Sequence, residues 1–141
     1  MQKHTFLPHT GDIRFSAEAD TFEELLLASA VALCDSVMGL EKVRKKISME
    51  IKVSAKGEEA LLHRFLEEVL FKIVSENVVF GAFEIRVEKE KNGLKCIAKC
   101  WGEPVGKRAR EIKVEVKAVT YNQFFVKKEG NKWKAQVVLD I

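Results

Sequence analysis

The chain has 141 residues, of which 47% are hydrophobic and 32% are charged. Its 24 Lys and Arg residues and 21 Asp and Glu residues give a formal net charge of only +3. This length and balance are typical of one soluble globular domain over residues 1–141. The small charge argues against a dedicated nucleic-acid-binding protein, because affinity for nucleic acid usually shows as concentrated positive charge.

The sequence contains no segment that predicts insertion into a membrane. Its longest apolar runs fall far short of the ~20 residues that span a bilayer. Residues Met1–Thr5 lack the apolar core of a signal peptide. Three cysteines are an odd number, which fits a reducing compartment. We therefore expect a cytoplasmic protein with no membrane partner.

Alternation of apolar and polar residues predicts eight strands. In chain order, these strands cover residues 3–7, 13–19, 47–55, 80–90, 94–101, 112–119, 123–128 and 132–140. The first two fit a hairpin joined by Pro8–Asp12, and Asn92-Gly93 is a strong hairpin turn signal.

Two other segments have the period of amphipathic helices. The first begins after Thr21, which forms a capping box with Glu24, and it stops at Gly39. The second covers roughly 58–75, and its polar side carries His63, which we expect to be solvated. This order of elements predicts an α+β fold in which two helices pack on one face of a mainly antiparallel or mixed sheet of about six to eight strands.

The sequence contains no motif of a catalytic nucleophile, a phosphate-binding loop or a zinc protease. Three polar segments remain as candidates for function: Pro8–Asp12, Lys117–Asn122 and Val137–Ile141. The alternative interpretations are an ordinary hairpin turn, a solvated sheet lysine and a frayed chain end. Two short basic segments, Arg44–Lys46 and the loop Gly102–Arg110, could contact phosphate, but the sequence favours solvated loops.

A metal site follows if the first and last polar segments meet. Asp12, Asp140 and the terminal carboxylate of Ile141 would then supply three hard oxygen ligands without His or Cys. Such a set suits Ca²⁺ or Mg²⁺ rather than zinc. The spacing alone leaves open whether these groups meet.

The order of these motifs resembles the archease family over nearly the whole chain. His9-Thr10-Gly11-Asp12-Ile13 resembles the family signature His-Thr-Ala-Asp-(Ile/Val). Lys117-Ala118-Val119-Thr120-Tyr121 resembles its Lys-Ala-(Val/Ile)-Thr-Tyr block, and Asp140-Ile141 resembles its Asp-(Ile/Val) ending. Gly11 in place of Ala is a mild departure, and Pro8 stands where many members carry an acidic residue.

The resemblance implies an accessory protein that is not itself an enzyme. Archeases assist the tRNA-splicing RNA ligase. They promote its guanylylation and its multiple turnover in tRNA exon ligation. The resemblance therefore implies that this protein contacts tRNA indirectly, through the ligase. The resemblance also implies a divalent metal, calcium first and magnesium or manganese as alternatives, held by Asp12, Asp140 and Ile141. It further implies that Lys117 is needed to activate the ligase.

Two other classes of function stay open. One is an RNA-binding or chaperone-like protein for RNA-modifying enzymes, against which the modest charge counts. The other is a metal-dependent hydrolase, against which the absence of a nucleophile or a histidine base counts.

Overall fold

The computed structural model describes residues 2–7 and 11–141. These residues form seven strands, two α-helices and two short 3₁₀ helices. The strands are β1 (Gln2–Leu7), β2 (Asp12–Ala19), β3 (Ile47–Ala55), β4 (Val78–Glu90), β5 (Gly93–Pro104), β6 (Ala118–Glu129) and β7 (Lys132–Asp140), and the helices are α1 (Phe22–Val37), η1 (Leu40–Lys42), α2 (Glu58–Glu76) and η2 (Gly106–Glu111). Among these helices, none is long and apolar enough to span a bilayer.

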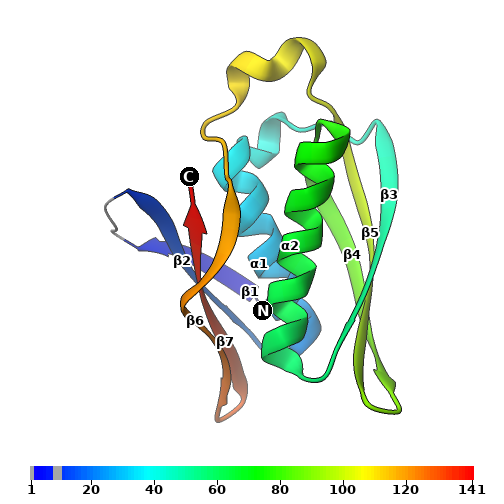
Figure 1. Ribbon diagram of the computed structural model, residues 1–141, viewed down its shortest axis with the longest axis vertical. Helices are drawn as coiled ribbons and strands as arrows, with labels where there is room; N and C mark the ends of the chain where they lie inside the picture. The colour runs from blue at the N-terminus through cyan, green and yellow to red at the C-terminus, as the bar shows by residue number, and fades with distance from the viewer. Residues whose placement is uncertain (1, 8–10) are drawn as a thin grey trace.

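The strands form two antiparallel sheets that enclose the two long helices. The first sheet has the order β1-β2-β7-β6, and the second has the order β3-β5-β4. Each long helix contacts strands of both sheets, and Figure 1 shows α1 and α2 between them. The predicted α+β class is confirmed, and seven strands lie within the expected number. The division into two sheets corrects the expectation of a single sheet covered on one face.

The burial of α1 explains why two sheets are needed. Ten of its side chains are buried, and Leu25, Leu26, Ala28, Ala30 and Leu33 point to different sides of the helix. A helix that is apolar around most of its circumference must be covered from more than one direction. The two sheets supply that cover.

Most predicted elements are confirmed, among them the strands over 47–55 and 132–140. The capping box is also confirmed, because the Glu24 backbone N–H donates to Thr21 Oγ1 at 3.1 Å. The strand predicted over 112–119 is wrong. Residues 112–117 have no regular structure, and β6 begins at Ala118. The apolar residues of the 112–117 segment still pack against the core, so the alternation in this segment indicates burial rather than strand pairing.

His63 is buried rather than solvated, which corrects the expectation from the helical pattern. Its side chain is 1% exposed and lies between α2 and β6. The imidazole stacks on Tyr121 with ring centroids 3.6 Å apart, and Phe124 meets it edge-on at 5.0 Å. The helical period could not anticipate this, because β6 covers the His63 position alone, while Arg64 and Glu67 on the same polar side of α2 stay exposed.

Candidate functional site

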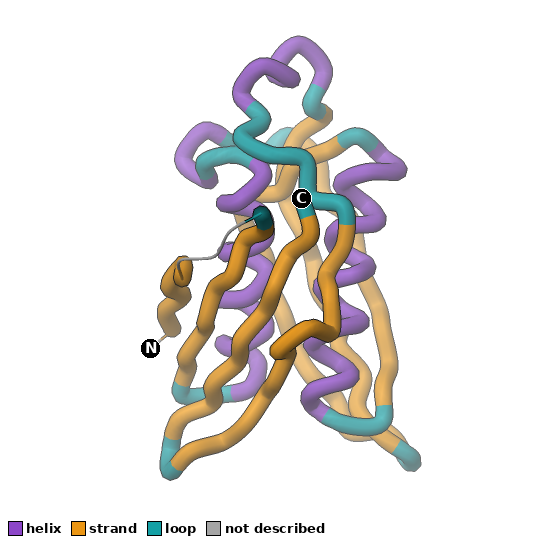
Figure 2. The backbone as a smooth tube through the Cα atoms, turned by 60° about the vertical axis from the view of Figure 1, so that its left-hand side comes forward, coloured by secondary structure: helices purple, strands orange, loops and turns teal. Residues whose placement is uncertain are grey.

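The ends of three strands bring two predicted site residues together. Asp12 opens β2 and stands opposite Asp140, which closes β7. Asp140 also stands opposite Ala118, the first residue of β6. Residues directly opposite in an antiparallel pair project to the same face with Cβ atoms about 5 Å apart. The Asp12 and Asp140 carboxylates therefore lie on one face of the first sheet, and Figure 2 shows the start of β2 and the C-terminus at the same end of that sheet.

The chain end at Ile141 is held in place rather than frayed. The Ile141 side chain is half-buried and packs against the core, and Leu139 before it is fully buried. The Asp140 carbonyl accepts a hydrogen bond of 2.7 Å from the Lys117 backbone N–H. Ile141 thus follows directly on Asp140 at a fixed strand end.

Lys117 joins this group through the backbone and has an exposed side chain. It precedes β6 and lines a cavity of about 300 Å³ together with Glu67 and Phe71 of α2. We call Asp12, Lys117, Asp140 and Ile141 the strand-end site. Of the predicted polar segment Pro8–Asp12, residues Pro8, His9 and Thr10 lie outside the described residues.

The chemistry of the strand-end site suits a hard divalent cation. Asp12 and Asp140 offer carboxylate oxygens, which calcium and magnesium prefer. Within residues 2–7 and 11–141, no group of three or more His, Cys, Asp and Glu side chains could hold a metal ion. A three-carboxylate set therefore requires the terminal carboxylate of Ile141 in addition to Asp12 and Asp140.

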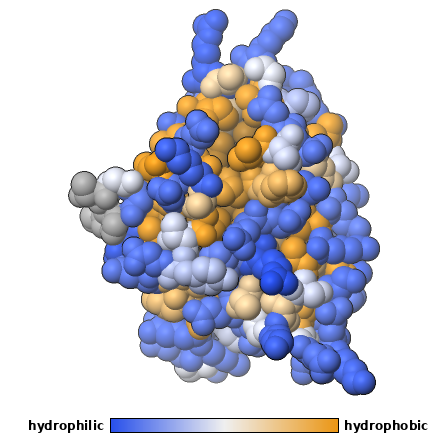
Figure 3. All heavy atoms as spheres, viewed as in Figure 1, coloured by the Kyte–Doolittle hydropathy of each residue, from blue (hydrophilic) through white to orange (hydrophobic). Residues whose placement is uncertain are grey.

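An apolar surface adjoins Lys117. A groove of about 360 Å³ runs between the C-terminal half of α2 and the segment that leads to β6, and its lining includes Leu70, Val74 and Val114. Phe71 and Val74 are 59% and 66% exposed. We call this groove with the exposed Phe71 the α2 groove, and Figure 3 shows apolar side chains gathered in a hollow on this face. Contiguous exposed apolar surface of this kind is typical of interaction sites.

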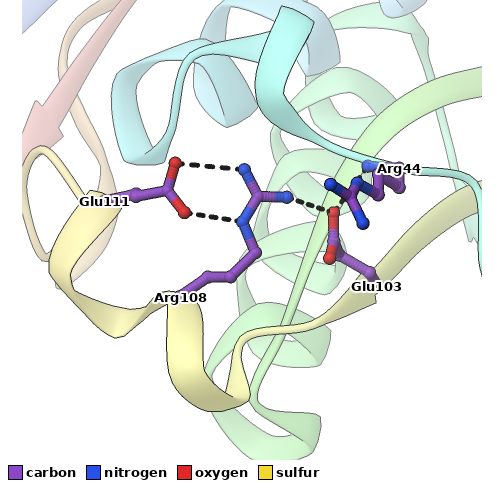
Figure 4. Close-up of polar contacts among 4 residues, drawn as sticks. All are labelled: Arg44, Glu103, Arg108 and Glu111. Atoms are coloured by element: carbon purple, nitrogen blue, oxygen red, sulfur yellow. Dashed lines mark hydrogen bonds and ion pairs between the residues drawn. The ribbon is translucent and has the colours of Figure 1, made fainter.

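A buried carboxylate at the end of β5 is a feature that the sequence interpretation missed. Glu103 is only 2% exposed, and its Oε2 accepts hydrogen bonds of 2.6 Å from the Arg44 backbone N–H and from Arg108 Nη1 (Figure 4). Arg108 also pairs with Glu111, which lowers the pKa of that carboxyl and raises the pKa of the guanidinium. Glu103 thereby fixes both η2 and the segment before β3.

Comparison with known proteins identifies relatives over the full length of the chain. Residues 4–141 match the model of the Archease protein family (MTH1598/TM1083). "Protein archease" of Pyrococcus abyssi is 39% identical over 142 residues, which cover 100% of both chains. "Protein archease" of Methanosarcina mazei is 36% identical over 143 residues, which cover 99% of this chain and 97% of the relative.

Solved structures share the fold. The solution structure of Methanobacterium thermoautotrophicum protein 1598 superimposes with a TM-score of 0.88 at 26% identity and covers 98% of each chain. A crystal structure from Thermotoga maritima, described as an archease and possible chaperone, has a TM-score of 0.61 at 21% identity over 96% of this chain and 94% of that chain. At the latter identity the likeness concerns the fold alone.

The role of Glu103 can be tested by unfolding in urea. Replacing Glu103 by Ala leaves the Arg44 amide and the Arg108 guanidinium without their buried acceptor, so we expect a loss of about 2 kcal/mol in the free energy of unfolding. The matched control is Glu111→Ala, which removes the more exposed partner of the same arginine and should cost much less. Equal losses in the two variants would contradict the role of Glu103 as the anchor.

Proposed function

Because the chain belongs to the archease family, we propose that it is a cytoplasmic accessory protein that activates the tRNA-splicing RNA ligase. The ligase carries out tRNA exon ligation, and this protein promotes its guanylylation and multiple turnover without being an enzyme itself. The observation that carries the proposal is the convergence of Asp12, Asp140, Ile141 and Lys117 at one end of the first sheet.

The carboxylates of the strand-end site would hold a divalent cation, calcium first and magnesium or manganese as alternatives. Asp12 and Asp140 face each other across β2 and β7, and the Ile141 carboxylate is the third donor. A bound cation supplies positive charge that offsets the repulsion among these groups. The residues themselves fix the positions of the three strand ends, so the surface offered to the ligase has a defined shape.

Lys117 is the positively charged group of the site. Its exposed ammonium is free to reach a phosphate of the nucleotide or a carboxylate of the ligase, while its backbone N–H stays bonded to Asp140. A contact that forms only when the ligase is ready to accept GTP shifts its population toward that state. Activation then needs no chemistry from this protein.

The α2 groove is the apolar part of the surface that the ligase would cover. Lys117 and Phe71 line the same cavity, so the α2 groove and the strand-end site are continuous. The two exposed apolar side chains Phe71 and Val74 are too few for a stable homodimer, whose interface needs roughly 800 Å² from each partner. They suit one part of a larger interface that also includes the polar strand ends.

Variants of the two aspartates test the metal and the activation together. We expect Asp12→Asn and Asp140→Asn each to weaken calcium binding by at least about tenfold, because each removes one anionic ligand. Both should also lower multiple turnover in a ligation assay with limiting ligase, excess tRNA halves and GTP. Calorimetric titration with calcium gives the affinity, and Glu129→Gln at the far end of the β6–β7 hairpin is the charge-matched control. A folded Asp140→Asn protein that activates the ligase fully would refute this role.

The terminal carboxylate can be tested without changing any side chain. Converting the C-terminus of Ile141 to an amide removes only its charge, and we expect calcium affinity to fall by at least about tenfold. A short Gly-Ser extension after Ile141, which moves the carboxylate away, should have the same effect. Calcium affinity that stays unchanged in both proteins would exclude the terminal carboxylate as a ligand.

A charge placed in the α2 groove tests the docking surface. Phe71→Glu should leave the fold intact, because Phe71 is largely exposed, and should weaken binding to the ligase about tenfold or more through lost apolar burial. Binding is measured by titrating labelled ligase with the variant. Asn131→Glu adds the same charge in the β6–β7 turn and should bind as the unmodified protein does. If both variants bind equally well, the ligase does not cover the α2 groove.

A further inference from the structure

The positive charge of the chain is concentrated in two short segments. Residues 41–46 and 103–113 together contain eight Lys and Arg residues and three Glu residues, which gives these segments a net charge of +5. The remainder has 16 Lys and Arg residues and 18 Asp and Glu residues, so its net charge is −2. The overall value of +3 therefore conceals a strongly uneven distribution.

The fold joins these two segments into one surface. Glu103 Oε2 accepts from the Arg44 backbone and from the Arg108 side chain, and the Lys46 N–H donates to the Gly102 carbonyl at 2.8 Å. Figure 4 shows Arg44 and Arg108 meeting at Glu103. The exposed cations of this surface, which we call the basic end, are Lys42, Arg44, Lys45, Lys46, Lys107, Arg110 and Lys113.

The cations of the basic end lie outside the ion pairs of the fold. In the part of the chain that the structure describes, none of the seven forms an ion pair. Lysines elsewhere do, as in the pairs Lys132–Asp20 and Lys134–Glu129. Arg108 is the exception near the basic end, because it bonds to Glu103 and Glu111. Exposed cations without ion-pair partners, gathered on one surface, are the pattern that a phosphate backbone attracts.

An aromatic side chain borders the basic end. Trp101 is half-buried on β5. Its side chain lies on the opposite face of the second sheet from the buried Cys100. Lys45 Nζ lies 5.9 Å and Lys99 Nζ 5.1 Å from the centroid of its ring. An aromatic ring flanked by lysines is the combination with which proteins stack a base and hold the adjacent phosphates of single-stranded nucleic acid.

The cations continue from the basic end toward the strand-end site. Lys113 lines a cavity of about 310 Å³ together with Asp12. Lys117 follows four residues later and is bonded to Asp140 through its backbone. A strand of nucleic acid lying on the basic end would thus lead to the strand-end site.

We propose that the basic end binds the phosphate backbone of single-stranded RNA directly, with a base placed against Trp101. The binding itself does not depend on the proposed function. Only the identity of the RNA as a tRNA exon half rests on it, since the ligase would bring that RNA to this surface.

The test measures binding of a fluorescent unstructured oligouridine at several salt concentrations without any ligase. Because each lost phosphate contact on a single strand makes the salt slope shallower by about 0.7, a variant with Arg44, Lys45, Lys46, Lys107 and Arg110 all changed to Gln should have a slope shallower by up to about 3.5. Its affinity should fall steeply. The charge-matched control changes five lysines near the opposite hairpin ends to Gln, and these are Lys56, Lys89, Lys91, Lys127 and Lys128. The control should bind nearly as the unmodified protein does.

Trp101→Leu provides an independent arm, because it removes the stacking ring and leaves every charge in place. We expect about a tenfold loss of affinity with an unchanged salt slope. Equal weakening by the two sets of glutamines would show attraction by overall charge and overturn the proposal. RNA affinity that is unchanged in the basic-end variant would also overturn it. If that variant then fails to activate the ligase, the basic end contacts an acidic protein surface instead. Failure of the unmodified protein to activate the ligase, with RNA binding intact, would count against the proposed function alone.

Discussion

The antiparallel register between β2 and β7 is the constraint on which both the core and the site depend. The pairing that sets Asp12 opposite Asp140 also sets Phe15 opposite Val137, and both of those side chains are fully buried. A slip of one residue would turn every side chain of one strand to the other face. It would expose Phe15 or Val137 and separate the two aspartates in the same step. The apolar side of the strands therefore fixes the geometry of the polar end.

The sequence patterns correctly predicted the elements that are decided by residues close together in the chain. The alternation in 47–55 and the Thr21 capping box specified their elements correctly, because neighbouring residues decide them. The division into two sheets, the burial of His63 and the loss of a strand over 112–117 all depend on partners distant in sequence. The family was recognised from its motifs and is confirmed, whereas the meeting of Asp12 and Asp140 needed the structure. The functional roles of those residues and of Lys117 stay predictions.

The electrostatic character of the protein likewise appears only after folding. A net charge of +3 argued against contact with nucleic acid, and the two basic segments looked like solvated loops. Glu103 changes that interpretation, because one buried carboxylate holds Arg44 and Arg108 on segments about 60 residues apart. The carboxylate is neutralised inside the protein while the surrounding lysines stay exposed. The acidic strand ends and the basic end are thus two adjoining surfaces of opposite charge on one small fold.

The position of β7 within the first sheet has a consequence for the order of folding. The second sheet and α2 are built from residues 47–104, so they can form while later residues are still being synthesised. The first sheet joins residues 2–19 to residues 118–140, and its inner strand β7 follows all the others in sequence. Until β7 inserts, β2 and β6 have unpaired edges and one side of α1 lacks its cover. A nascent chain therefore exposes apolar surface over most of its synthesis, and the strand-end site forms in the same event that closes the core.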